Sequence, residues 1–64
     1  MAWYEKLKFA RKVRGFTLRE VEKQTGLSNP YLCQIEAGQI KDPSFFKVAK
    51  LMKLYNLDII DLGV

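Results

Sequence analysis

The sequence predicts an all-α fold of five short helices, and three observations lead to this prediction. Apolar residues recur at three- and four-residue spacings, which is the period of an amphipathic helix. Helix-capping residues and glycines separate these periodic segments. No segment alternates apolar and polar residues convincingly enough for a strand. The chain has 64 residues, 48% of them apolar, so we expect one domain over residues 1–64 with its own hydrophobic core.

The first predicted helix covers residues 2–14. Apolar residues at helical spacing give it one apolar face, which consists of Trp3, Leu7, Ala10 and Val13. Gly15 follows, and glycine readily enters the left-handed conformation in which many helices end. We therefore expect the helix to end at Gly15.

The second predicted helix, residues 18–25, has the clearest start in the sequence. Thr17 and Glu20 form a T-x-x-E capping box, in which each side chain accepts a hydrogen bond from the backbone N–H of the other residue. Phe16 and Val21 have the spacing of a hydrophobic staple around this box. Gly26 is expected to end the helix.

The third predicted helix covers residues 29–37. Ser28 is its expected N-cap, and Leu27 and Leu32 have the spacing of a hydrophobic staple. Pro30 falls in the first turn, where a backbone N–H would have no helical partner. Gly38 is expected to end the helix.

A fourth helix is predicted to start either after Ser44 or after Asp42, with Pro43 as its first residue in the second case. Its apolar positions are Phe45, Val48, Leu51, Met52 and Tyr55. Asn56 is expected to end it. Asp58 is then expected to cap a fifth helix of a single turn, residues 59–62.

Only three residues, 26–28, join the second and third predicted helices. A connection this short, with Gly26 at the bend and Leu27 directed inward, forces the two helices to cross steeply. The expected apolar contacts between them are Val21, Leu27, Leu32 and Ile35. This is the helix-turn-helix arrangement, whose second helix can enter the major groove of DNA, about 12 Å wide.

The stretch from Leu18 to Gly38, "LREVEKQTGLSNPYLCQIEAG", resembles the Xre/Cro-type helix-turn-helix family of phage and bacterial regulators. The preceding "ARKVRGFT" and the following "DPSFFKVAKLMKLYNLDIIDL" extend the resemblance over residues 7–62. It implies a five-helix, lambda-repressor-like DNA-binding domain, with the motif at residues 18–37 and its recognition helix at residues 29–37. It also implies a sequence-specific transcriptional regulator of double-stranded DNA, expected to act as a dimeric repressor on a pseudo-palindromic operator.

The face of the third helix opposite its apolar contacts is small and polar, as expected of a surface that reads bases. The predicted base contacts are Asn29, Pro30, Cys33 and Gln34. A carboxamide can pair with adenine through two hydrogen bonds, and the resemblance implies contacts to bases or adjacent phosphates for Asn29 and Gln34. Asn29 has a second interpretation, a local hydrogen bond at the helix start. Cys33 is interpreted as a small residue tolerated beside DNA rather than as a redox sensor.

Five residues are expected to contact the DNA backbone, namely Thr17, Arg19, Ser28, Tyr31 and Lys41. Thr17 and Ser28 start helices, whose first N–H groups bind anions. Arg19 follows the position at which many relatives carry a phosphate-binding Gln. The resemblance implies a backbone contact for Lys41, in the loop after the recognition helix. The hydroxyl of Tyr31 either contacts a phosphate or packs sideways.

Two glutamates raise separate questions about the recognition helix. The resemblance implies a partly buried ion pair between Glu36 and Arg11, which would fix the orientation of that helix through a bidentate contact. The alternative is two exposed charges that stabilise almost nothing. Glu22 stands where many relatives have a small residue, so its side chain has to point into solvent or pair with Lys23 or Arg19.

The formal net charge of +4 is unevenly distributed, which favours a polyanionic partner. The first third of the chain holds Lys6, Lys8, Arg11, Lys12, Arg14, Arg19 and Lys23. The last eleven residues, 54–64, contain no basic residue. They carry instead an apolar tail, which is the expected homodimer interface and consists of Leu57, Ile59, Ile60, Leu62 and Val64.

Several classes of function are not expected. The chain has no His and a single Cys, so it has neither an intramolecular disulfide nor a zinc-type ligand set. We expect no enzyme, metal or cofactor, because no nucleophile–base pair, carboxylate dyad or phosphate-binding glycine loop is recognisable. No apolar run is long enough to span a membrane, and the charged N-terminal segment is unlike a signal peptide. These features indicate a cytoplasmic, nucleoid-associated protein.

Other functions remain open for the same fold. An antitoxin with a protein partner such as a toxin, or a restriction-system controller, would have the same motif. A protein-interaction module that has lost DNA binding is an alternative from another class, and Leu18, Glu22 and Asp42 favour it.

Overall fold

The computed structural model describes residues 2–62 of the chain. It contains four α-helices, which are α1 (Trp3–Val13), α2 (Leu18–Thr25), α3 (Asn29–Glu36) and α4 (Phe45–Tyr55). A short 3-10 helix, η1 (Ile59–Leu62), follows them. Within residues 2–62 no strand is present. The prediction of an all-α fold is therefore confirmed.

The prediction of five α-helices is wrong, because the last segment is a 3-10 turn. The N–H of Asp61 donates to the carbonyl of Asp58 at 2.9 Å, a bond across three residues rather than four. The capping carboxylate also belongs to Asp61, which accepts the N–H of Asp58 at 2.8 Å. Four residues is a usual length for a 3-10 helix.

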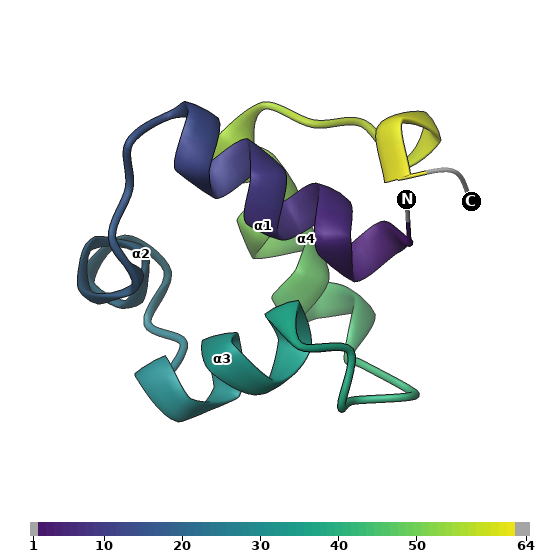
Figure 1. Ribbon diagram of the computed structural model, residues 1–64, viewed down its shortest axis with the longest axis horizontal. Coiled ribbons are helices and arrows are strands. Elements are labelled where there is room, and N and C mark those ends of the chain that lie inside the picture. Colours follow the sequence, from purple (N-terminus) through teal and green to yellow (C-terminus); the bar gives the residue numbers. More distant parts are fainter. Residues whose placement is uncertain (1, 63–64) are drawn as a thin grey trace.

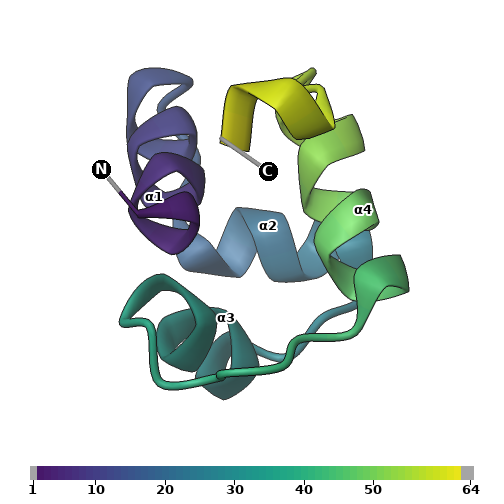
Figure 2. The same cartoon turned by 90° about the vertical axis from the view of Figure 1, so that its right-hand side faces the viewer.

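The helices are arranged so that α3 lies along one side of the molecule and η1 lies on the opposite side (Figures 1 and 2). Between them, α1 and α4 pack against each other and against neighbouring helices. In Figure 1, α2 is seen along its axis whereas α3 lies across the view, so the two helices cross steeply. This confirms the geometry expected from the short connection between them.

The core draws apolar side chains from all four α-helices and from the turn between α2 and α3. Its buried members are Leu7, Ala10, Val21, Leu27, Leu32, Ile35, Val48, Leu51 and Tyr55. The four contacts predicted between the second and third helices all belong to this set. Burial of each of these four aliphatic side chains contributes about 1.5–3 kcal/mol, so the core fixes the position and orientation of α3.

The predicted start of α2 and the predicted turn after it are confirmed. The N–H of Thr17 donates to Glu20 Oε1 at 2.9 Å, and the N–H of Glu20 donates to Thr17 Oγ1 at 3.1 Å. Gly26 ends α2 in the left-handed region, with φ of 77°. Gly38 has φ of 74°, and a Cβ there would lie 2.6 Å from the ring of Tyr4. Both glycines are thus required by the backbone path around α3.

Two predicted apolar positions are exposed instead of buried. Val13 and Phe45 are each 64% exposed. Val13 is the last residue of α1 and Phe45 the first of α4, so each lies at the free end of a helix. Val48, three residues after Phe45, is already buried, so the exposure of α4 is confined to the very start of the helix.

Candidate nucleic-acid interface

The two faces of α3 differ completely in their surroundings. Leu32 and Ile35 are buried against the other helices. Pro30, Cys33 and Gln34, which were predicted to contact bases, are all exposed. Since these three residues share one side of the helix, α3 is held to the domain by one face and presents the other to solvent. In both ribbon views α3 forms the lower edge of the molecule (Figures 1 and 2).

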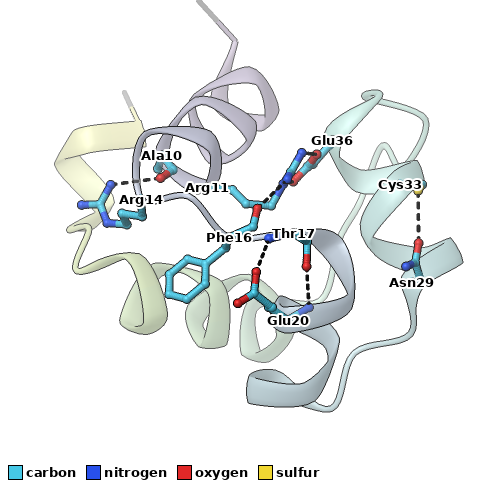
Figure 3. Close-up of polar contacts among 9 residues, drawn as sticks. All are labelled: Ala10, Arg11, Arg14, Phe16, Thr17, Glu20, Asn29, Cys33 and Glu36. Atoms are coloured by element: carbon cyan, nitrogen blue, oxygen red, sulfur yellow. Dashed lines mark hydrogen bonds and ion pairs between the residues drawn. The ribbon is translucent and has the colours of Figure 1, made fainter.

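Asn29, the remaining predicted base contact, is the first residue of α3 and is half-buried. Its Oδ1 accepts a hydrogen bond from the Cys33 thiol, with a distance of 3.5 Å between sulfur and oxygen (Figure 3). The local helix cap is supplied instead by Ser28, whose Oγ accepts the N–H of Tyr31 at 3.3 Å. The contact with Cys33 uses only the amide oxygen, so the two N–H donors of Nδ2 are left for an acceptor on a base.

Glu22 occupies a place that the sequence did not predict. It pairs with neither Lys23 nor Arg19. Its Oε2 accepts the backbone N–H of Asn29 at 2.9 Å, so the carboxylate of α2 caps the start of α3. This contact spans seven residues and the whole turn, and only the three-dimensional path of that turn brings the two groups together.

The start of α3 therefore differs from the anion site expected there. The N–H of Asn29 is bound to Glu22, Pro30 has no N–H, and the N–H of Tyr31 is bound to Ser28. The prediction that first-turn N–H groups of this helix bind phosphate is wrong for these three positions. Ser28 itself is exposed, and its hydroxyl keeps its own proton to donate.

The start of α2 is more open to an anion. The capping box satisfies the N–H groups of Thr17 and Glu20. Within residues 2–62, those of Leu18 and Arg19 have no protein acceptor. Thr17 and Arg19 are both exposed. Hydrogen bonds from the backbone and side chain of Thr17 lower the pKa of the Glu20 carboxyl below its usual value.

Tyr31 and Lys41, also predicted to contact the DNA backbone, are placed differently. The hydroxyl of Tyr31 is buried without a hydrogen-bond partner, and Lys47 Nζ lies 4.6 Å from the centre of its ring. Tyr31 thus packs sideways, and a phosphate contact through its hydroxyl is inconsistent with this arrangement. Lys41 is exposed in the loop between α3 and α4.

At the other end of α3, Glu36 forms an ion pair with Arg11 of α1. Glu36 Oε2 lies 2.8 Å from Arg11 Nε, and Oε1 lies 3.2 Å from Nη2, so the contact is bidentate (Figure 3). Arg11 Nη1 also donates to the carbonyl of Phe16 at 2.8 Å. The hydrogen bond to Glu36 is the main cause that raises the pKa of Arg11. One guanidinium thus joins α1, the approach to α2 and the end of α3.

The apolar tail predicted to form a dimer interface is only partly described. Leu57 packs against the core of its own domain, whereas Ile60 is 80% exposed. Val64 lies outside the described residues, and the side chains of Ile59 and Leu62 are likewise not described.

Sequence patterns did not predict an exposed aromatic pair at the start of α4. Phe45 and Phe46 stack edge to face with ring centres 6.3 Å apart, and Phe46 is 80% exposed. Periodicity placed Phe45 in the core and gave no role to Phe46. The polar loop before them was the available sign that nothing would cover this helix end.

Comparisons with known proteins agree with this geometry. A family described as "Helix-turn-helix domain" matches residues 4–62 of the chain. A comparison with curated proteins found no match.

Within residues 2–62 no helix is both long and apolar enough to cross a membrane, and the same residues contain no cluster of three potential metal-binding side chains.

Proposed function

We propose that this chain, which belongs to the helix-turn-helix domain family, is a sequence-specific regulator of the Xre/Cro type. Membership of this family indicates a DNA-binding regulator rather than an enzyme. The observation that carries this proposal is the exposed face of α3. The helix is anchored on its apolar side and at both ends, while Pro30, Cys33 and Gln34 face solvent. A rigid helix with one free polar face is what the major groove accommodates.

In this proposal, α3 lies in the major groove and reads bases with Asn29, Pro30, Cys33 and Gln34. The amides of Asn29 and Gln34 supply hydrogen bonds that distinguish one base from another, each contributing about 1–3 kcal/mol of discrimination. Pro30 and Cys33 are small and apolar, and they fit against base edges such as the thymine methyl group.

Backbone contacts come from elements on either side of α3. Thr17 and Arg19 at the start of α2, the hydroxyl of Ser28, and Lys41 in the loop after α3 are the proposed phosphate ligands. These contacts position the protein on the duplex without reading its sequence. The net charge of +4 supports attraction to the polyanion.

We further propose that the protein acts as a homodimer, and that it represses transcription by covering a promoter. Two copies of α3 would then read half-sites about 34–36 Å apart in a pseudo-palindromic operator. Ile60 supports a contact between tails because it leaves a large apolar side chain exposed. Nucleoid association in the cytoplasm follows from this function.

Dimerisation is tested by sedimentation of the wild-type protein with and without a selected duplex. Ile60→Ser should weaken self-association, whereas Phe46→Ser, equally exposed at 80% but at the start of α4, should not. A protein that stays monomeric on DNA at micromolar concentrations would refute the dimer.

The alternatives that use this fold belong to two other classes of protein, namely other DNA-binding proteins and protein-interaction modules. An antitoxin bound to a toxin, or a restriction-system controller, would use the same DNA-binding face. A protein-interaction module is favoured by one observation, the exposed pair Phe45 and Phe46, which is the kind of apolar surface that protein partners cover.

The experiment that separates a DNA-binding regulator from a protein-interaction module is selection of bound duplexes from a random pool, followed by a salt series. A regulator yields a two-fold symmetric consensus sequence. The logarithm of its binding constant for DNA also falls, by about 0.9 per contacted phosphate, for each unit rise in the logarithm of the salt concentration. An interaction module yields no consensus, and its association with a protein is insensitive to salt.

A further inference from the structure

The carboxylate of Glu22 lies at the place where a phosphate would bind if α3 used its N-terminus as an anion site. Its Oε2 accepts the N–H of Asn29 at 2.9 Å, and the contact is partly buried. Pro30 and the Ser28 cap leave no N–H free at the next two positions. A phosphate approaching this end meets a carboxylate oxygen where free backbone N–H groups would otherwise lie, and the hydroxyl of Ser28 is the donor that remains.

The charge at this end of α3 has the wrong sign for DNA. A helix N-terminus carries the equivalent of about half a positive charge, which a full carboxylate charge outweighs. Among residues 2–62, the one ion pair within 4.0 Å is that of Arg11 and Glu36, so no cation neutralises Glu22 at that distance. The N-terminal end of α3 thus carries a carboxylate without a direct counter-ion, although the protein as a whole is positive.

We propose that Glu22 is a specificity-determining residue that denies the backbone N–H groups at the start of α3 to the phosphates of DNA. The inference rests on the proposed DNA-binding function and deepens it. Phosphate contacts supply essentially all of the affinity for random DNA, whereas base contacts add to them at an operator. Repulsion between the Glu22 carboxylate and the phosphates therefore weakens complexes with random DNA most. Complexes in which α3 also contacts matching bases are weakened less.

The test compares Glu22→Gln with a matched control, Glu5→Gln. Glu5 accepts the N–H of Ala2 at 2.8 Å at the start of α1, so both substitutions remove one charge and keep an acceptor for a helix-capping hydrogen bond. Binding of a random-sequence duplex and of a selected duplex is measured for each variant at one salt concentration. Relative to Glu5→Gln, Glu22→Gln should bind the random duplex about two- to fivefold more tightly. The preference for the selected duplex should fall.

The outcomes separate this inference from the proposed function. If both variants gain the same factor, only net charge matters and the role of Glu22 is overturned. If wild-type protein binds no duplex, the proposed function fails, and this inference fails with it. Glu22→Ala removes both the charge and the hydrogen bond, and it tests the same point should the Gln variant not fold. A purely structural role would lower its melting temperature without raising its affinity for random DNA.

Discussion

Each end of α3 is held by one glutamate, and the two glutamates work in opposite surroundings. Glu36 pairs with Arg11, and their side chains are only 9% and 11% exposed. Glu22 binds a backbone N–H and has no cation within 4.0 Å among the described residues. The C-terminal end is therefore fixed by a shielded, charge-assisted contact. At the N-terminal end, the N–H of Asn29 donates to a carboxylate without a counter-ion, next to the Ser28 cap.

The helix dipole explains why each end needs its own arrangement. A negative charge is unfavourable at a C-terminus and favourable at an N-terminus. Glu36 is tolerated at its end because Arg11 compensates it, whereas Glu22 interacts favourably with the start of α3 without a cation. We therefore expect the end with Glu36 to contribute more to stability, and the end with Glu22 to have its proposed effect on DNA binding.

The largest effect is expected from breaking the C-terminal contact. Arg11→Met leaves Glu36 without its cation and should lower the free energy of unfolding by about 3–5 kcal/mol, measured by urea denaturation. Arg14→Met is the control, since Arg14 is exposed and bonds only the carbonyl of Ala10 in its own helix, at 3.2 Å (Figure 3). Equal losses in the two variants would show that the ion pair has no special importance.

A second prediction concerns Tyr55, which packs in the core near this end of α3. Burial, reinforced by the negative charge of Glu36, raises the pKa of Tyr55 to about 12 from its usual 10.0. Because the folded state favours the neutral phenol, its contribution is complete below pH 10 and is lost as the pH rises through 12. The loss is about 2–3 kcal/mol.

Unfolding measured across this range, for wild type and for Tyr55→Phe, checks the prediction. Lysine deprotonation affects both proteins equally, so only the difference between them reports on Tyr55. The wild-type curve should fall more steeply above pH 10. Parallel curves would contradict it.

At the N-terminal end, Asn29→Ala tests base reading. The variant should lose preference at one base-pair position, a discrimination of about 1–3 kcal/mol, and should remain folded. Gln24→Ala removes an exposed amide from α2 and should leave every base preference unchanged. Affinities for a panel of single-substitution duplexes provide the measurement. An unchanged preference profile for Asn29→Ala would remove this residue from the interface.

The smallest effect is expected outside α3. Lys41→Ala should weaken binding to all duplexes alike and reduce the magnitude of the salt slope by about one. Lys53→Ala, which removes an equally exposed lysine from the last turn of α4, should leave the slope unchanged. A loss of sequence preference in Lys41→Ala would mean that the loop reads bases.

Much of the fold was predictable because its signals are local. Thr17 and Glu20 are three residues apart, and Gly26 needs only its own backbone conformation, so both could be recognised from the sequence. The helix ends Val13 and Phe45 could not be placed, since periodicity does not tell where neighbouring helices stop. Asp58 was the expected cap of the final one-turn segment, but the capping carboxylate belongs to Asp61, three residues later.

The site was less predictable than the fold for a related reason. The outward face of α3 followed from the positions of Leu32 and Ile35, which had to be buried. The contact of Glu22 with the N–H of Asn29 depends on how the chain turns through Gly26, and no spacing rule describes it. The sideways packing of Tyr31 similarly depends on Lys47, sixteen residues away on α4.

The central claim is that the exposed face of α3 contacts DNA, and an NMR titration tests it most directly. Backbone and side-chain amide signals of labelled protein are followed as a selected duplex is added. The largest shifts are expected at residues 29–37, with smaller ones at Thr17, Arg19 and Lys41 and little change at Phe9 on α1. Shifts centred on α1 or on the tail, with α3 unaffected, would contradict the account.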